Sequence, residues 1–270
     1  MEISNLYKYD SYLVPNLNFL LSTYIREYDI SKANISILKK YGYISDSEYY
    51  KYYNMDKLDR NISIGLRIRD DKQMRDGLME GFKLSRKEFF EANNIEDHHV
   101  FGIKRDAIYL VNKIPNVLEF DGIEFTHRNT YSSFYKVNNL EIYYYLDKMN
   151  DIAKLDIKGI SDEKLKLHEY YMIDFLKYLF EVAETSSFPS DQITILNNFY
   201  ELYIKLMLEP GYYRELNQQS LFKLYSSTYK QYQLHSISEK DLKYLDITTN
   251  MNILRVLNSY YSILWSRFIR

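Results

Sequence analysis

Residues 100–113, VFGIKRDAIYLVNK, decide the fold that this sequence predicts. Two short apolar runs lie on either side of a polar turn at Lys104–Asp106, a pattern typical of a β-hairpin. The same style continues downstream, where VLEF, IEFTHR, SSFYKV and LEIYYYL alternate with turns at Asp121-Gly122 and Asn138-Asn139. These turn pairs tolerate positive φ and favour tight hairpins. We therefore predict an antiparallel sheet over residues 100–145.

The segments before this hairpin are predicted to be mainly helical. Residues 12–28 form an extended approach to Asp29, and a helix over 30–41 stops at Gly42. A polar, tyrosine-rich helix is expected after Ser45. A longer helix over about 72–93 has a stripe of apolar residues at helical spacing, made of Met74, Leu78, Phe82, Phe89 and Phe90.

From Ser161 onward, capping residues and apolar periodicity indicate further helices. The breaks fall at Ser186–Ser190 and at Pro210-Gly211. We therefore predict an α+β fold. An antiparallel sheet with helices on one face occupies residues 1–150, and a helical C-terminal lobe occupies residues 151–270.

Composition limits the class of protein. The chain has no cysteine, so disulfides and thiolate metal sites are excluded. It shows neither a secretion signal nor a run of about 18 apolar residues, so we expect a cytoplasmic protein with no membrane partner. The net charge of −2 creates no general attraction to nucleic acid. The 30 tyrosines either fill the core or offer faces that stack on bases or bind a protein partner.

Three short segments contain residue types that suit phosphoryl chemistry. Asp29 stands where an extended segment turns into a helix, and Asp106 stands at a hairpin turn. Between them, Lys57, Arg60 and Asn61 are spaced to share one helical face. Nucleotidyl transfer needs two carboxylates for hard divalent cations, and basic groups that neutralise a triphosphate.

The order of these segments resembles the palm of template-directed DNA polymerases, the B type most closely, over about residues 28–135. Asp29 matches the aspartate that opens the first motif of that family, and Asp106 matches its hairpin aspartate. The run from Lys57 through Asn61 to Gly65 has the spacing of its fingers helix. Thr126-His-Arg-Asn-Thr-Tyr131 is weakly similar to the motif that follows the hairpin.

The resemblance implies a palm-like sheet, a thumb-like helical lobe and roles for specific residues. Asp29 and Asp106 would be the catalytic residues that bind Mg²⁺ or Mn²⁺. Nucleic acid and nucleoside triphosphates would be the partners. The remaining candidates are Lys57, Arg60, Asn61 and Asn34 for the nucleotide, and Arg128 and Tyr131 for the primer end.

The sequence also departs from the family pattern. Asn34 stands where the family has the tyrosine that screens the sugar, and Ile62 and Ile64 replace the serine and tyrosine of its fingers helix. The hairpin has one aspartate, where the family usually has two. These differences concern sugar discrimination and base stacking.

Each candidate also has a purely structural interpretation. Asp29 could cap a helix, and Asp106 could be a hairpin turn residue. Lys57 and Arg60 could lie on a solvated helix face beside neighbouring acids. The adjacent pair His98-His99 is expected in a loop, because neighbouring strand residues point to opposite faces and cannot readily share one metal ion.

We therefore favour one function and keep two others open. The favoured function is metal-dependent nucleotidyl transfer by a small or degenerate template-directed polymerase acting on a nucleic-acid primer. The alternative is a non-catalytic, phage-type accessory or regulatory protein that binds another protein or nucleic acid through a tyrosine-rich surface. A helical scaffold without a site is the third. The polymerase prediction requires Asp29 and Asp106 on adjacent strands with their carboxylates within about 5 Å, and carboxylates that point apart would contradict it.

Overall fold

The computed structural model of the chain describes residues 3–17, 19–20, 23–137, 140–147, 149 and 152–159, with a few isolated positions between 177 and 207. The helical lobe predicted from residue 151 begins instead with a strand, because Ile152–Lys158 pair with the preceding strand of the sheet. The rest of the lobe lies almost wholly outside the described residues, so its helices stay a prediction. Contacts divide the chain into two compact units. Unit 1 comprises Met1–Leu17 and Thr23–Tyr131, and unit 2 comprises Asn18–Ser22 and Ser132–Arg270.

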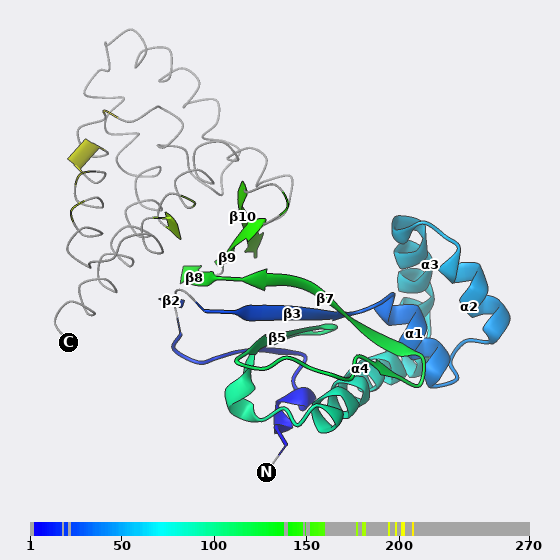
Figure 1. Ribbon diagram of the computed structural model, residues 1–270. Helices are drawn as coiled ribbons and strands as arrows, with labels where there is room; N and C mark the ends of the chain where they lie inside the picture. Colours follow the sequence, from blue (N-terminus) through cyan, green and yellow to red (C-terminus); the bar gives the residue numbers. More distant parts are fainter. Residues whose placement is uncertain are drawn as a thin grey trace, which may run out of the picture. The chain divides into compact units, whose positions relative to one another are not determined.

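Unit 1 is built on a six-stranded antiparallel sheet (Figure 1). β3 (Ile25–Ile30) lies in the middle, hydrogen-bonded to β5 on one side and to β7 on the other. In spatial order, the strands are β1 (Ser11–Leu13), β4 (Val100–Lys104), β5 (Ala107–Val111), β3, β7 (Ile123–Tyr131) and β6 (Glu119–Phe120).

Four helices connect β3 to β4. They are α1 (Ala33–Lys40), α2 (Asp46–Tyr53), α3 (Lys57–Asp70) and α4 (Lys72–Ala92), and a 3-10 turn, η1 (Asn5–Lys8), precedes β1. The tyrosine-rich segment predicted as one helix forms two, α2 and the start of α3. Ser45 and Glu48 form a capping box at α2, and Asp56 accepts the amides of Leu58 and Asp59 at the start of α3.

The helices pack on one face of the sheet through α1 and α4. The predicted apolar stripe of α4 is confirmed, because all five of its residues are buried. Phe89 stacks on Phe125 of β7 with 4.2 Å between ring centroids, and Tyr28 of β3 joins the same cluster. Burial of such aromatic side chains contributes on the order of 2 kcal/mol each, so this layer holds the sheet against α4.

Unit 2 has its own antiparallel sheet, in the order β10 (Ile152–Lys158), β9 (Leu140–Asp147), β8 (Ser133–Val137) and β2 (Phe19–Leu20). The predicted antiparallel strands over 100–145 are confirmed, but they are divided between two sheets at Tyr131–Ser133. The predicted α+β class is also confirmed. In the part of the chain that the structure describes, no helix is long and apolar enough to cross a bilayer.

Candidate functional site

Asp29 lies near the end of the central strand β3, two residues before the chain turns into α1. Its register partner on β5 is Ala107, the residue after Asp106. The backbone N–H of Ile30 donates to the carbonyl of Asp106 over 3.2 Å. The central strand and the β4–β5 turn therefore bring the two aspartates to the same end of neighbouring strands.

Asp106 lies in the two-residue turn of the β4–β5 hairpin, after Arg105, whose φ is +50°. Arg86 of α4 holds this turn, since its guanidinium donates to the Arg105 carbonyl. It also donates to the carbonyls of Tyr7 and Tyr9, over 3.0 and 2.9 Å. The Arg86 side chain is fully buried, and burial lowers its pKa. A buried cation thus fixes the turn that carries Asp106.

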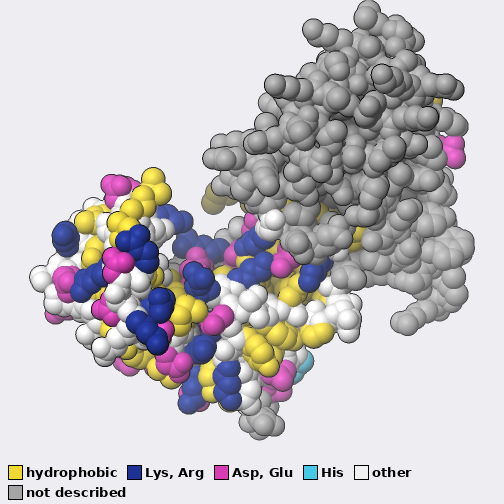
Figure 2. Space-filling view, turned by 180° about the vertical axis from the view of Figure 1, so that it is seen from behind, with side chains coloured by type: hydrophobic (Ala, Val, Ile, Leu, Met, Phe, Trp, Pro, Cys, Tyr) yellow, Lys and Arg dark blue, Asp and Glu magenta, His cyan; other side chains and the backbone are white. Residues whose placement is uncertain are grey.

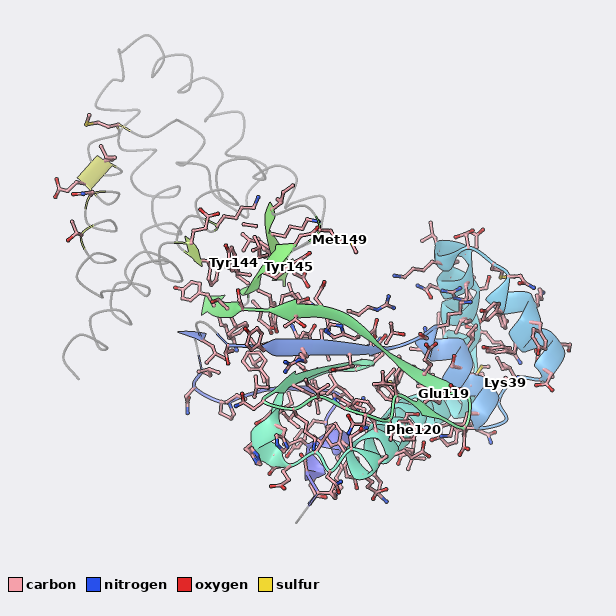
Figure 3. All side chains as sticks on the ribbon, in the orientation of Figure 1. Lys39, Glu119, Phe120, Tyr144, Tyr145 and Met149 are labelled. Atoms are coloured by element: carbon pink, nitrogen blue, oxygen red, sulfur yellow. The ribbon has the colours of Figure 1, made fainter. Side chains whose placement is uncertain are left out.

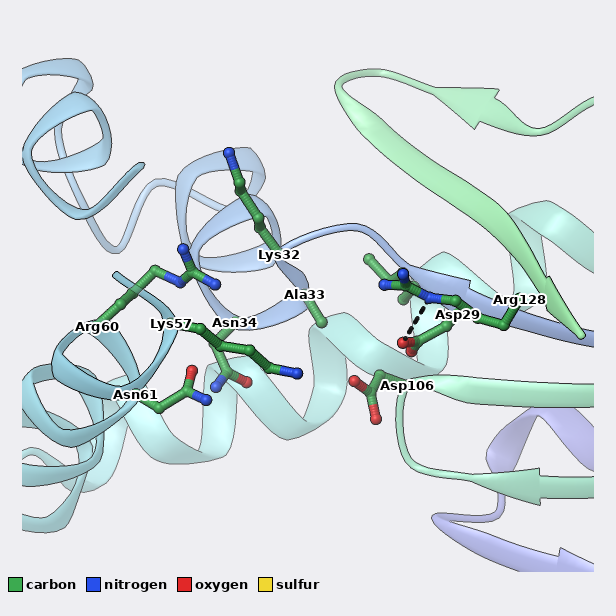
Figure 4. Close-up of a pocket in the computed structure, with 10 residues that line it drawn as sticks. Asp29, Lys32, Ala33, Asn34, Lys57, Arg60, Asn61, Asp106 and Arg128 are labelled. Carbon is green, nitrogen blue, oxygen red and sulfur yellow. Dashed lines mark ion pairs between the residues drawn. The ribbon is translucent and has the colours of Figure 1, made fainter. Parts of the chain in front are cut away.

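Arg128 reaches the same place through an irregularity of β7. Glu27 pairs with Asn129 and Tyr28 pairs with His127, so the register shifts and Arg128 has no partner on β3. Such β-bulges redirect side chains. Here the guanidinium Nε of Arg128 lies 3.4 Å from Oδ2 of Asp29 (Figure 4).

The electrostatics of Asp29 are unusual for a surface acid. Its other oxygen, Oδ1, is buried and has no hydrogen-bond partner among the described residues. Burial, followed by the negative charge of Asp106, raises the pKa of Asp29 to about 6, although Arg128 opposes this shift. The pair is therefore a site where a bound cation would relieve two costs, the unsolvated oxygen and the repulsion between the carboxylates.

The turn after Asp29 exposes the start of α1. Lys32 adopts a left-handed conformation with φ +48° and precedes the helix without giving it a side-chain cap. The Ser31 hydroxyl is bonded to that of Thr126 at 2.7 Å, which ties this turn to β7. The first amides of α1, those of Ala33 and Asn34, lack intrahelical acceptors and carry partial positive charge.

α3 supplies the facing wall. Lys57, Arg60 and Asn61 lie within its first five residues, and their spacing places them on the same face. Figure 4 shows Lys57 and Asn61 extending from α3 toward the space in front of Asp106 and Asn34. The predicted sharing of one helical face is therefore confirmed for these three residues.

These groups enclose a pocket of about 330 Å³ within unit 1. Two carboxylates lie at one end and basic groups surround the rest, so the lining has four cationic side chains against two acids. The residues that line it are Asp29, Ile30, Lys32, Ala33, Asn34, Lys57, Arg60, Asn61, Asp106 and Arg128.

Tyr131 is the one sequence candidate that does not line this pocket. Its ring is fully buried in β7, and its hydroxyl donates to Oε2 of Glu27 over 2.5 Å. The Tyr109 hydroxyl donates to the other oxygen of Glu27 over 2.7 Å. A side chain held in this way has no free face for a primer strand, so the predicted contact of Tyr131 with a primer is not supported.

The structure bears on three of the structural interpretations of the candidate residues. Asp29 does not cap α1, because the residue at the cap position is Lys32. Asp106 does occupy a hairpin turn, and it lines the pocket as well. His98 and His99 lie in a 3-10 turn, η2 (Asp97–His99), just before β4, where a loop pair was predicted.

The sequence interpretation missed Lys32 and Arg86. Lys32 gives no local signal, because its importance depends on its left-handed backbone at the mouth of the pocket. Arg86 could have been recognised. It stands four residues after Phe82 in the apolar stripe of α4, and an arginine at a core position must find several acceptors.

The donor set at the carboxylate end fits a hard cation. Asp29 and Asp106 offer oxygen ligands of the kind that Mg²⁺ and Mn²⁺ prefer, and Oδ1 of Asp29 has no other partner among the described residues. No group of three or more histidines or acids in the described part of the chain could enclose a metal ion alone. A cation here would therefore need further oxygens from water or a phosphorylated ligand.

The family model described as "Bacteriophage PBS1 gene 130 protein" matches residues 1–262 of the chain. No curated protein matches it in sequence.

Proposed function

We propose that this chain, which belongs to the bacteriophage PBS1 gene 130 protein family, carries out metal-dependent nucleotidyl transfer onto a nucleic-acid primer. One observation carries the proposal. Asp29 and Asp106 come together at the end of adjacent strands, opposite the basic first turn of α3, in one pocket. The resemblance to palm-type polymerases rests on the same residues in the same order.

In this proposal the pocket divides into two parts. Asp29 and Asp106 would hold Mg²⁺ or Mn²⁺, which would supply positive charge to the phosphate oxygens. Lys57 and Arg60 bind the triphosphate, whose negative charge they offset. The uncapped N–H groups at the start of α1 donate hydrogen bonds to further phosphate oxygens.

The remaining polar residues fix the reactants. Asn34 and Asn61 hydrogen-bond the nucleotide, and Arg128 binds a phosphate of the primer strand once it releases Asp29. The terminal hydroxyl of the primer then attacks the α-phosphorus and loses its proton to water. A new phosphodiester bond forms as the bond to pyrophosphate breaks.

The test is primer extension with Mg²⁺ or Mn²⁺ on DNA and RNA templates, using the parent chain, Asp29→Asn and Asp106→Asn. We expect extension by the parent and a loss of about a hundredfold or more in each variant. Asp121→Asn is the matched control, because Asp121 is also a hairpin-turn aspartate but is exposed and does not line the pocket. Equal extension by all four proteins would refute the roles of both aspartates.

A second function has its own supporting observation. Arg128 pairs with Asp29, and the described residues offer only two carboxylates in the pocket. A protein derived from a polymerase could keep this arrangement as a structural ion pair and bind nucleic acid or a protein without catalysis. Retained nucleic-acid binding with no extension under any metal condition would favour this alternative.

A further inference from the structure

The helix α2 presents an aromatic surface beside the pocket. Tyr49, Tyr50 and Tyr53 lie on one side of α2, with ring centroids of Tyr49 at 5.7 Å from Tyr50 and 5.8 Å from Tyr53. Tyr50 is 60% exposed and Tyr53 is 45% exposed. We call these three residues the α2 tyrosine face. Neither of the two exposed rings belongs to the buried core of unit 1 or to the residues packed against it.

Two lysines border this face. Nζ of Lys39 lies 4.5 Å from the ring centroid of Tyr49 and 5.5 Å from that of Tyr50. Nζ of Lys32 lies over the ring of Tyr53. Lys32 also lines the pocket, so the α2 tyrosine face continues into it through a single side chain. Figure 3 shows Lys39 at the corner where α1 and α2 meet.

The charge of this region differs from that of the chain as a whole. Residues 32–72 contain nine Lys and Arg against six Asp and Glu, a balance of +3 in a chain whose net charge is −2. Figure 2 shows several of the Lys and Arg side chains of unit 1 at its surface, interspersed with acids. This part of the sequence is therefore more favourable to an anionic partner than the net charge of the chain suggests.

Exposed rings next to cations suit one ligand class best. Single-stranded nucleic acid binds through bases that stack on aromatic faces and phosphates that meet Lys or Arg. A protein partner is favoured by a patch whose centre is depleted of charge, which two lysines over the rings do not provide. A duplex hides the faces of its bases, so it cannot use the tyrosines.

We propose that the α2 tyrosine face binds the unpaired part of a nucleic-acid strand that continues into the pocket. Tyr50 and Tyr53 stack on successive bases. Lys32 moves from the Tyr53 ring to an adjoining phosphate, and Lys39 exchanges its ion pair with Asp46, at 3.1 Å, for another. The inference rests on the proposed function for the role of the pocket. It deepens that function by assigning the single-stranded segment a place on the protein.

The experiment measures binding rather than catalysis. Fluorescence anisotropy of a labelled oligothymidine of about ten nucleotides, without divalent metal, compares the parent chain with Tyr50→Ala/Tyr53→Ala. We expect the double variant to bind about tenfold or more weakly, because two stacking surfaces are lost. Tyr50→Phe/Tyr53→Phe keeps both rings and should bind within about twofold of the parent, since stacking needs no hydroxyl.

Tyr9→Ala is the matched control. Tyr9 is 54% exposed and has an aromatic neighbour, Tyr12, at 6.1 Å, but it lies away from α2 in the sequence and does not line the pocket. The single variant Tyr50→Ala guards against misfolding of the double variant, because it changes the more exposed ring. The proposal would be overturned if the alanine variants bound the oligothymidine as tightly as Tyr9→Ala does. It would also be overturned if the phenylalanine variant lost as much affinity as the alanine double variant, or if the parent did not bind.

Primer extension separates this proposal from the proposed function. If the parent binds the oligothymidine through the tyrosines but never extends a primer, the proposed binding surface is supported and the proposed transferase activity is refuted. If the parent extends primers and the tyrosine variants bind the oligothymidine normally, the proposed activity is supported and the proposed binding surface is refuted. With a template overhang of about six nucleotides, we expect the tyrosine variants to bind more weakly, and with a blunt duplex we expect no difference.

Discussion

Nε of Arg128 lies 3.4 Å from Oδ2 of Asp29, on the carboxylate whose other oxygen has no hydrogen-bond partner among the described residues. The guanidinium and a metal cation therefore compete for one acid. We predict that Arg128→Gln binds Mn²⁺ severalfold more tightly than the parent, because a neighbouring positive charge is removed. The measurement is calorimetric titration with Mn²⁺. Arg69→Gln, at an exposed arginine paired with Asp70, is the control and should not change the affinity.

The same substitution should weaken nucleic-acid binding if Arg128 contacts a phosphate. Metal affinity and nucleic-acid affinity are thus expected to change in opposite directions in Arg128→Gln. Unchanged Mn²⁺ affinity would show that the ion pair does not compete with a cation.

The raised pKa of Asp29 predicts that the free energy of unfolding depends on pH. The pKa of this acid is about 6 in the folded state and 3.8 as the ordinary value, so the folded state binds its proton more tightly. The stabilising contribution of protonated Asp29 is complete below about pH 4 and is lost as the pH rises through 6. Asp29→Asn should therefore be more stable than the parent at pH 7.5, by on the order of 2 kcal/mol, and the difference should shrink toward pH 4.

Urea unfolding of both proteins between pH 4 and 7.5 measures this difference. The comparison of parent and variant cancels the other acids that titrate in the same range. A difference that does not change with pH would show that Asp29 ionises normally in the folded protein.

Arg86 is expected to be essential for stability. Arg86→Met leaves the carbonyls of Tyr7, Tyr9 and Arg105 without their buried donor, which costs on the order of 3–5 kcal/mol in the free energy of unfolding. Urea unfolding gives the value. Lys87→Met, at the next residue of α4, changes only a surface pair with Glu91 and should stay within about 0.5 kcal/mol of the parent.

Substitution by alanine at two glycines inside helices is expected to change the stability of the protein in opposite directions. A Cβ at Gly81 of α4 would lie 2.3 Å from Cγ2 of Ile37, so Gly81→Ala must separate α4 from α1 and should destabilise the protein. A Cβ at Gly65 of α3 meets nothing within 4 Å, so Gly65→Ala should stabilise it by up to about 1 kcal/mol. Thermal unfolding compares the two. Stabilisation by Gly81→Ala would contradict the close packing of α1 on α4.

The sequence predicted the parts of this fold that depend on local pattern. The α4 stripe, the β4–β5 hairpin and the position of Asp29 beside Asp106 all follow from periodicity, turn residues and motif order. The break between α2 and α3 at Asn54–Asp56 was missed, because residues of helical spacing continue across it. The capping of α3 by Asp56 marks where the new helix begins. The division of the strands into two sheets was missed because pairing partners are set by tertiary contacts rather than by the strands themselves.

The candidate site was likewise predicted where it depends on local pattern and missed where it depends on tertiary contacts. Seven of the eight predicted site residues line the pocket, since the motif spacing placed them at the ends of neighbouring elements. Tyr131 lies only three residues from Arg128, yet it is buried against Glu27. The bulge in β7 changes which residues share a face, and no pattern in residues 123–131 announces it.

The strand β2 belongs to the sheet of unit 2, although it lies early in the chain, between the two segments of unit 1. Phe19 pairs with Tyr135, so this edge of the second sheet leaves the ribosome more than a hundred residues before its partner does. The second sheet therefore cannot be completed during early synthesis. A recombinant protein that ends at Tyr131 would carry an orphaned strand, and unit 2 expressed alone would lack one. Separate production of the two units requires that Asn18–Ser22 be moved by circular permutation.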